Sequence, residues 1–447
     1  MKATKTVVIG AGSADFGPGI LGDVLGNPAF GGSTLALVDV NKSSLDLMTS
    51  LAKRMNREWG SGVKIEASVD RKRALPEADF VIVAVEVERM ERWRLDYEVA
   101  LKHGLRQPFS ENGGPGGFAH AARNIAIVMG ICEDMRKLCP DAWFFNYTNP
   151  VPRITQAASK YGGVKAAGFC HGIGIACENV GKLLGIPDDD LDLKAAGLNH
   201  FTWILDARRK STGEDLYPAM RRKLKNWPAG FEPLSRDVFE LLGLFPVCGD
   251  THVAEYLPWV SDPITKPWEK YGLNPPRFDP SRSRSKRREE ERRRVVAQAS
   301  GEESIEEYRE GSGERACHVA AAIAGNSNTY ELAINIPNEG YVANLPQGAI
   351  VEVPAMVSAI GIRGVPVGEL PEPVAELCRR EIAVAKLAVA AAATGDKRLA
   401  LQALLMDAMM TDIERAKAIL NDYLEVHGDL LPQFRQRRPA ARKASGR

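Results

Sequence analysis

Cysteine is scarce and scattered in this chain. Its 447 residues include seven cysteines, an odd number, and no two of them form a Cys-x-x-Cys pair. A disulfide framework is therefore not expected. No secretory signal pattern precedes the first apolar run, Val7-Val8-Ile9. These absences fit a reducing, cytoplasmic compartment.

Neither sign of charge dominates, and no apolar run is long enough to cross a membrane. The chain has 58 Lys and Arg against 57 Asp and Glu, which gives a formal net charge of +1. No overall attraction to nucleic acid or to an anionic membrane is therefore expected. With 45% hydrophobic and 26% charged residues, the composition is typical of a globular enzyme. The length allows two or three domains, and we find no internal repeat.

Short β-branched and apolar runs alternate with helical patterns over the first half of the chain. Strands are expected at 5–9, 34–39, 65–69, 80–85, 143–146 and 164–169. The run from Phe80 to Val85 is apolar throughout, as in a strand that is covered on both faces. This alternation predicts an α/β fold with an N-terminal Rossmann-like domain over residues 1–199, built on a doubly wound parallel sheet.

The pattern changes after about residue 200, where clean β-α units give way to loops and longer helices. Helical patterns cover 370–393 and 398–426, with a break at Gly395-Asp396. We therefore expect a C-terminal mixed α+β domain with long helices at 200–434.

Two strongly charged segments lie in the second half of the chain, and neither is expected to bind nucleic acid. The stretch 282–294 mixes Arg, Lys and Glu and is expected to form a solvated helix supported by Glu–Arg pairs. The basic tail 435–447 has little apolar material and is expected to be disordered.

A glycine-rich turn lies near the start of the chain. Gly10-Ala11-Gly12-Ser13 follows a strand and precedes an apolar helix. Gly10 would allow the tight turn, while Gly12 and Ser13 would approach a pyrophosphate at the helix N-terminus. Asp15 stands where the fingerprint has its third glycine, but Asp39 ends the next strand, where an acid binds ribose hydroxyls. The pattern predicts a site for NAD rather than NADP, with a glycine-rich turn of another α/β fold as the alternative.

Cys170 and His200 each follow an apolar run, and Cys170 should lie at the carboxyl end of a strand. A thiolate and an imidazole together suit a borderline metal such as Mn, Fe, Co, Ni or Zn. Taken alone, each is more simply a buried or hydrogen-bonded structural residue. Their joint position beside a dinucleotide crevice favours a metal site with open positions for a substrate diol and water.

Several motifs, in this order along most of the chain, resemble those of glycoside hydrolase family 4, the NAD- and metal-dependent glycosidases. They are Gly10-Ala-Gly-Ser13, Gly113-Gly-Pro-Gly-Gly117, Asn146-Tyr-Thr-Asn149-Pro150, Cys170-His171-Gly172, Gly197-Leu-Asn-His200, the segment Gly249 to Pro258, and Ile334-Asn335-Ile-Pro-Asn338. Within that family, Cys-His-Ser resembles the α-glucosidase and α-galactosidase members. Cys-His-Gly, as found here, resembles the group assigned to α-galacturonides.

The resemblance implies NAD and a divalent metal as cofactors, with Mn preferred and Co, Ni or Fe as alternatives. In the family scheme, NAD⁺ takes hydride from C3 of the sugar, and the metal held by Cys170 and His200 binds the C2 and C3 oxygens as a Lewis acid. A base removes the C2 proton, the bond between C1 and the leaving oxygen breaks, water adds at C1 and NADH returns the hydride. NAD-dependent glycosidases are thus an exception to hydrolysis by two carboxylates. A homodimer or homotetramer is also implied.

The resemblance assigns further roles to single residues. His171 matches the position that protonates the departing oxygen, with an orienting role as its alternative. The C2 base is expected at Asp250 or Tyr256, with Asp250 preferred. The residues expected to bind the sugar are Asn149, Asn112 and His252. A turn is the competing explanation for both asparagines.

We therefore expect an enzyme that hydrolyses α-glycosides, with α-galacturonides preferred. Alternatives within the family are α-glucosidase, α-galactosidase and α-glucuronidase activity. An NAD-dependent 2-hydroxy acid dehydrogenase would share the dinucleotide half, but it needs no metal and would accumulate NADH. A non-catalytic NAD-binding protein would bind the dinucleotide and hydrolyse nothing.

Overall fold

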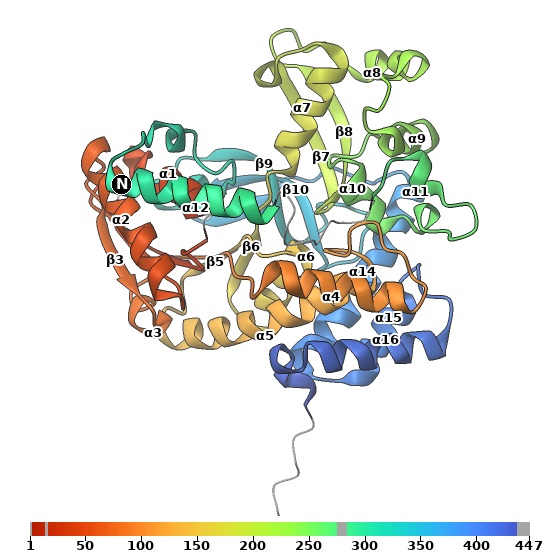
Figure 1. Cartoon of the computed structure of the whole chain (residues 1–447). Coiled ribbons are helices and arrows are strands. Elements are labelled where there is room, and N and C mark those ends of the chain that lie inside the picture. The colour runs from red at the N-terminus through yellow and green to blue at the C-terminus, as the bar shows by residue number, and fades with distance from the viewer. Residues whose placement is uncertain (1, 14–16, 275–283, 436–447) are drawn as a thin grey trace, which may run out of the picture.

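The first half of the chain forms a parallel sheet with a hydrophobic core on each face (Figure 1). The computed structural model describes residues 2–13, 17–274 and 284–435. Its parallel strands are β1 (Lys5–Ile9), β2 (Thr34–Val38), β3 (Lys64–Ser68), β4 (Phe80–Val83), β5 (Trp143–Asn146) and β6 (Lys165–Gly168). Val8 points into one core and Val7 into the other, because successive strand residues face opposite sides. The predicted Rossmann-like sheet is confirmed.

The strand order creates a switch point between β1 and β4. The parallel strands lie in the order β3-β2-β1-β4-β5-β6, and β1 pairs in parallel with both β2 and β4. Doubly wound sheets bind ligands outside the carboxyl ends of their strands at such a point. Gly10, Asp39 and Cys170 follow β1, β2 and β6 closely, so the topology brings them to one edge.

The second half of the chain adds antiparallel strands to the same sheet. They are β7 (Leu191–Leu198), β8 (Phe201–Arg209), β9 (Thr329–Pro337), β10 (Ile350–Ser358) and β11 (Gly361–Gly364). β9 pairs with β6 through Gly168 and Asn335, and β10 bridges β9 and β7. The domain boundary expected at residue 199 falls in the turn of the antiparallel β7–β8 hairpin. The two halves therefore share one 11-stranded sheet, because β9 of the second half pairs with β6, the edge strand of the first half.

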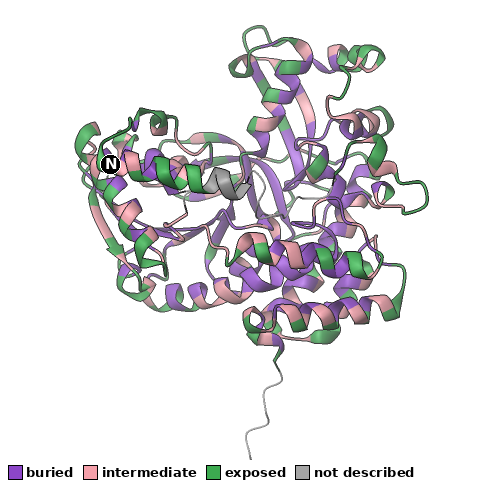
Figure 2. Ribbon diagram, viewed as in Figure 1, coloured by how far each residue is buried: buried purple, intermediate pink, exposed green. Residues whose placement is uncertain are grey.

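Helices surround this sheet, and the buried residues concentrate in the strands and on the inner helix faces (Figure 2). The helices are α1 (Gly17–Leu25), α2 (Lys42–Trp59), α3 (Arg71–Ala74), α4 (Arg89–Lys102), α5 (Gly114–Leu138), α6 (Val151–Gln156), α7 (Gly172–Leu184), α8 (Tyr217–Lys223), α9 (Pro233–Leu242), α10 (Asp250–Val253), α11 (Pro267–Lys270), α12 (Arg284–Ser300), α13 (Ala316–Gly325), α14 (Glu372–Thr394), α15 (Lys397–Met406) and α16 (Ile413–Val426). No helix in the described ranges is long and apolar enough to cross a bilayer.

The C-terminal helices differ in one respect from the sequence pattern. α14 ends at Thr394, before Gly395 with its left-handed φ of 74°, and the Asp396 side chain caps α15. The single helix expected at 398–426 is two helices, because Asp412 caps the backbone N–H of Arg415 and starts α16. Of the basic tail, residues 436–447 lie outside the described residues.

The described part of the charged segment 282–294 forms a helix with Glu–Arg pairing, as expected from the sequence. It forms α12, in which Arg293 pairs with Glu289 one turn away at 2.6 Å. The helix packs against α2, and Arg54 of α2 donates to the carbonyl oxygens of Gln298 and Glu303.

A buried ion pair connects α4, α5 and the C-terminal end of the fold. Arg123 donates two hydrogen bonds to the Asp96 carboxylate, at 2.5 and 2.6 Å, and Nε2 of His427 lies 2.8 Å from the same group. The Asp96 and His427 side chains are fully buried. Burial alone would raise the pKa of Asp96, but Arg123 and His427 outweigh it and hold that pKa below its usual value. The contribution of this pair to stability is therefore full above the pKa of Asp96 in the unfolded chain, and it is lost as the pH falls from there through the lower pKa of the folded state.

We predict that Asp96→Asn lowers the free energy of unfolding by about 3–5 kcal/mol, because Arg123 is left as an uncompensated buried charge. Urea denaturation monitored by circular dichroism measures this. The matched control is Asp46→Asn, whose partner Lys42 is exposed and whose loss should cost about 0.5 kcal/mol or less. A cost within about 1 kcal/mol for both variants would show that the buried pair contributes little.

Candidate functional site

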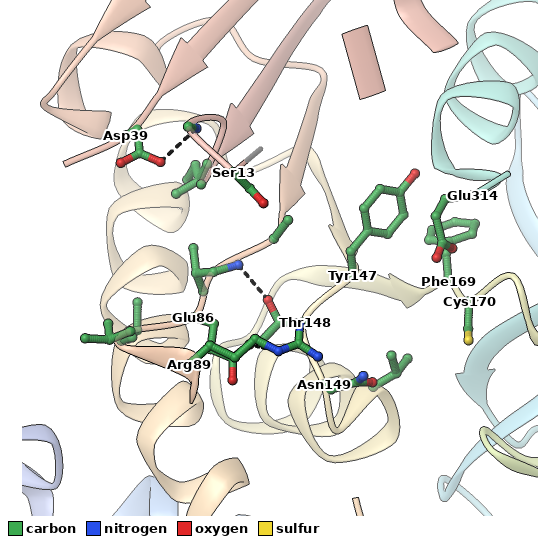
Figure 3. Close-up of a pocket in the computed structure, with 18 of the residues that line it drawn as sticks. Ser13, Asp39, Glu86, Arg89, Tyr147, Thr148, Asn149, Phe169, Cys170 and Glu314 are labelled. Atoms are coloured by element: carbon green, nitrogen blue, oxygen red, sulfur yellow. Dashed lines mark hydrogen bonds and ion pairs between the residues drawn. The ribbon is translucent and has the colours of Figure 1, made fainter. Parts of the chain in front are cut away.

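A single cavity of about 930 Å³ lies at the carboxyl edge of the parallel strands. Figure 3 shows Ser13 and Asp39 at one end and Cys170 and Glu314 at the other. His171, His200 and His252 also line it, as do Arg71, Arg89 and Arg292. The predicted dinucleotide and metal residues therefore share one cavity, although they come from both halves of the sequence.

The glycine-rich turn lines the first end of the cavity. Gly10 has a φ of 90°, and a Cβ there would collide with the carbonyl oxygen of Ala84. The Gly12 N–H donates to Asp39 Oδ2 at 2.8 Å, and the Asn41 N–H donates to Oδ1 at 2.8 Å. The Asp39 carboxylate is thus fixed at the tip of β2 while it lines the cavity. This arrangement fits a dinucleotide phosphate and ribose, whereas Asp15 lies outside the described residues.

The thiol of Cys170 and the imidazole of His200 meet at the other end. Cys170 Sγ lies 3.6 Å from His200 Nε2. Zinc binds a thiolate sulfur at about 2.3 Å and an imidazole nitrogen at about 2.0–2.1 Å. With a near-tetrahedral angle between them, two such ligand atoms would be separated by roughly the distance seen between Cys170 Sγ and His200 Nε2. Burial raises the pKa of Cys170, while burial and His252 lower the pKa of His200 well below its usual value. A neutral imidazole is the form that binds metal, and a bound cation would deprotonate the thiol.

Buried hydrogen bonds hold the turn that carries His200. His200 has a left-handed φ of 63° between β7 and β8. The buried Glu352 carboxylate of β10 accepts hydrogen bonds from Asn199 at 2.8 Å, from Thr202 at 2.8 Å and from Asn335 at 2.7 Å. Glu352 thus ties the hairpin turn to β9 and β10, and no sequence signal had singled it out.

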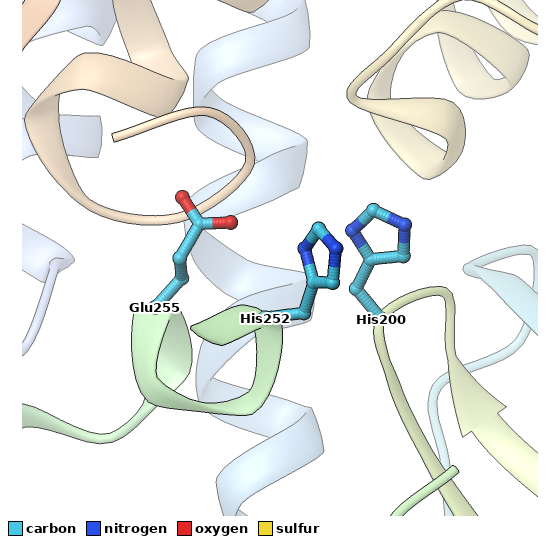
Figure 4. A group of neighbouring side chains, drawn as sticks. All are labelled: His200, His252 and Glu255. Atoms are coloured by element: carbon cyan, nitrogen blue, oxygen red, sulfur yellow. The ribbon is translucent and has the colours of Figure 1, made fainter. Parts of the chain in front are cut away.

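A second imidazole and a carboxylate lie beside His200 (Figure 4). The rings of His200 and His252 are 4.2 Å apart between centroids, and their nitrogens and a Glu255 oxygen lie within 4.8 Å of one another. Glu255 accepts the backbone N–H groups of Glu111 at 2.7 Å and Asn112 at 2.9 Å. Burial, and then Glu111, raise the pKa of Glu255 to about 7. Glu255 therefore fixes the loop before α5, a role that its motif alone had not revealed.

The two residues expected as C2 base do not reach the cavity lining. Asp250 accepts the N–H groups of Leu234 and Ser235, each at 2.7 Å, at the start of α9. The Tyr256 hydroxyl is buried 3.5 Å from the Asn199 carbonyl oxygen. Asp250 thus binds the N-terminus of α9, and Tyr256 packs among core residues.

The residues expected to contact the sugar are partly brought together. Asn149 and His252 line the cavity, as does His171, whose Nδ1 lies 2.9 Å from Glu314 Oε1. This hydrogen bond raises the pKa of His171. Asn112 is buried behind the lining and donates to Glu255 at 3.2 Å, so its side chain supports the loop instead.

A polar wall, of which the sequence had indicated only Glu111, joins the two ends. Arg89 lies 3.3 Å from Glu86 and 3.0 Å from Glu111, and all three line the cavity. Behind them, His120 Nε2 is 3.2 Å from Glu86. Burial would lower the pKa of His120, but the hydrogen bond to Glu86 outweighs it and raises that pKa. Glu86 and Arg89 are neighbours in the sequence, whereas Glu111 and His120 follow later in the chain, and no common motif connects the four.

Comparison with known proteins gives two matching family models. Residues 5–186 match the Family 4 glycosyl hydrolase model, and residues 195–410 match the model of the Family 4 glycosyl hydrolase C-terminal domain. An α-glucosidase of Erwinia rhapontici is 31% identical over 91% of this chain and 94% of its own length. An α-galacturonidase of Bacillus subtilis is 30% identical over 94% of this chain and 97% of its own.

Solved structures share the fold. A 6-phospho-α-glucosidase from gut microorganisms, determined in complex with NAD and Mn²⁺, is 23% identical and superposes with a TM-score of 0.80 over 97% of this chain and 100% of that one. Together with the two family models and the full-length relatives, this makes the chain a member of the family 4 glycosyl hydrolases.

Proposed function

We propose that this glycosidase hydrolyses α-glycosides, with α-galacturonides as its preferred substrates, and that it uses NAD and a divalent cation, preferably Mn²⁺. The observation that carries the proposal is the single cavity that joins the Gly10–Asp39 end to Cys170 and His200. A glycosidase that works through two carboxylates does not need a dinucleotide-binding site. The joined cavity supports a reaction that needs both cofactors at one sugar.

Each end of the cavity would hold one cofactor. Gly10, Gly12 and Ser13 would bind the dinucleotide phosphates, and Asp39 would bind a ribose hydroxyl. When bound, NAD would supply hydride exchange at C3, and the metal on Cys170 and His200 would polarise the neighbouring sugar hydroxyls.

The protein's own side chains would orient the sugar and move two protons. The amide of Asn149 would bind hydroxyl groups, and His252 would contact the sugar beside His200. His171 would donate a proton to the departing oxygen. Asp250 would accept the C2 proton, with Tyr256, whose hydroxyl lies 3.5 Å from the carbonyl oxygen of Asn199, as the alternative base.

The preference for galacturonides rests on Cys170-His171-Gly172 and on the α-galacturonidase relative. A uronate carboxylate also needs a cation, and Arg89 lines the cavity. The second candidate is an α-glucosidase, which the 31% identical relative supports.

A panel of nitrophenyl glycosides tests the function. We expect hydrolysis of the α-galacturonide above the α-glucoside, α-galactoside, α-glucuronide and 6-phosphoglucoside, and only when NAD and Mn²⁺ are both present. NADH absorbance should not accumulate, since the hydride returns to the product. Stoichiometric NADH would instead indicate a dehydrogenase, and NAD binding without any hydrolysis would indicate a non-catalytic protein.

We predict that Cys170→Ser abolishes hydrolysis and weakens Mn²⁺ binding, because a hydroxyl is a poor substitute for a thiolate. Removing an outer partner of a ligand already costs about 10–100-fold in affinity, so losing a ligand should cost at least about 100-fold. Titration calorimetry with Mn²⁺ measures the binding directly. Cys177→Ser is the control, because this half-buried thiol on α7 is outside the cavity lining. Unchanged Mn²⁺ affinity in Cys170→Ser would remove Cys170 from the metal site.

A further inference from the structure

We infer that Glu314 is a positioning residue that fixes the orientation and the tautomer of His171. The inference rests on the proposed function, because His171 acts there as the proton donor to the departing oxygen. Glu314 lies far from His171 in the sequence, and no motif of the chain connects the two residues.

The contact between the two side chains is specific. His171 Nδ1 lies 2.9 Å from Glu314 Oε1. The His171 side chain is 55% exposed and the Glu314 side chain is 6% exposed, so a flexible ring in the cavity is held by a buried carboxylate. Both residues line the cavity, and Figure 3 shows Glu314 at its Cys170 end.

The loop that carries Glu314 is anchored to the first half of the fold. The Glu314 N–H donates to Ser312 Oγ at 3.0 Å. The Ser312 N–H donates to Asp23 Oδ1 of α1 at 3.0 Å, and its hydroxyl donates to Asp23 Oδ2 at 2.5 Å. Gly313, with a φ of 75°, carries the loop past the Cβ of His171. The loop before α13 is thereby tied to the helix that follows the glycine-rich turn.

This geometry leaves one ring nitrogen for chemistry. Because Glu314 accepts the hydrogen bond of the Nδ1–H group, Nε2 is the nitrogen that remains for the cavity. In the proton transfer, the Nε2–H bond breaks, an O–H bond forms on the departing oxygen, and the other proton stays on Nδ1 against Glu314. Glu314 Oε2 is also buried and has no hydrogen-bond partner among the described residues. Among these residues, no other side chain therefore engages this second oxygen of the carboxylate.

Leaving-group dependence distinguishes positioning from a merely structural role. For the sugar that the wild type accepts, we would compare the p-nitrophenyl glycoside, which leaves without help, with the methyl glycoside, which needs a proton. Glu314→Ala should lower kcat on the methyl glycoside by about 100-fold and on the p-nitrophenyl glycoside by less than about fivefold. Glu314→Gln should recover most of the loss, because its amide oxygen still accepts from Nδ1–H. Glu310→Ala, an exposed neighbour, should match the wild type on both.

A second readout needs neither substrate nor cofactor. Nitrogen-15 NMR of histidine-labelled full-length protein reads the tautomer of each ring, and with seven histidines in the chain a His171→Gln spectrum assigns the signal. Wild type and Glu314→Gln should show a protonated Nδ1 at His171, and Glu314→Ala should show mixed tautomers.

The outcomes separate the two claims. An unchanged tautomer in Glu314→Ala, or an equal loss on both glycosides, would overturn the positioning role. If the wild type hydrolyses no glycoside but the tautomer shifts as expected, the proposed function fails while the positioning of His171 by Glu314 stands. If Glu314→Ala does not fold, the Glu314→Gln variant decides, since loss of the protonated Nδ1 in that variant would also contradict the inference.

Discussion

The site depends on two antiparallel strands, β9, which pairs with the edge strand β6 of the parallel sheet, and β10, which connects β9 to β7. Through this pairing, the turn between β7 and β8 reaches the carboxyl end of β6, where Cys170 and His200 come within 3.6 Å. The buried Glu352 holds that turn by hydrogen bonds to side chains of both the hairpin and β9. Without the second half of the chain, the Rossmann-like half would have a dinucleotide crevice and one isolated thiol.

The same constraint explains why one cavity can serve two cofactors. A dinucleotide bound at Gly10 and Asp39 would lie at the carboxyl edge of the sheet, in the cavity that also reaches β5 and β6. The polar wall of Glu86, Arg89 and Glu111 runs along this edge. Glu255 fixes the backbone of the loop that carries Glu111. Buried carboxylates thus act on this site mainly by holding backbone and side chains in place.

Local signals in the sequence predicted the sheet, the glycine-rich turn and the pair Cys170 and His200. These features depend on residue periodicity, on glycine at a left-handed turn and on the chemistry of soft ligands. The sharing of one sheet by the two halves was not predictable in this way, because the pairing of β6 with β9 joins segments far apart in the chain. Asp250 and Tyr256 carry suitable chemistry in a suitable motif, but motif chemistry does not say which way a side chain points. Glu314, Glu352 and Glu255 act through contacts across the fold, which no local pattern records.

In the proposed reaction, hydrolysis passes through removal of the proton at C2, which a two-carboxylate glycosidase never removes. Hydrolysis of the accepted glycoside in deuterated water, with NAD and Mn²⁺ present, is the decisive test, because proton NMR of the released sugar reads the C2 position. We expect deuterium at C2 of the product. A product without deuterium at C2, from protein that is active only with NAD and metal, would contradict the elimination route and leave the dinucleotide with a structural role.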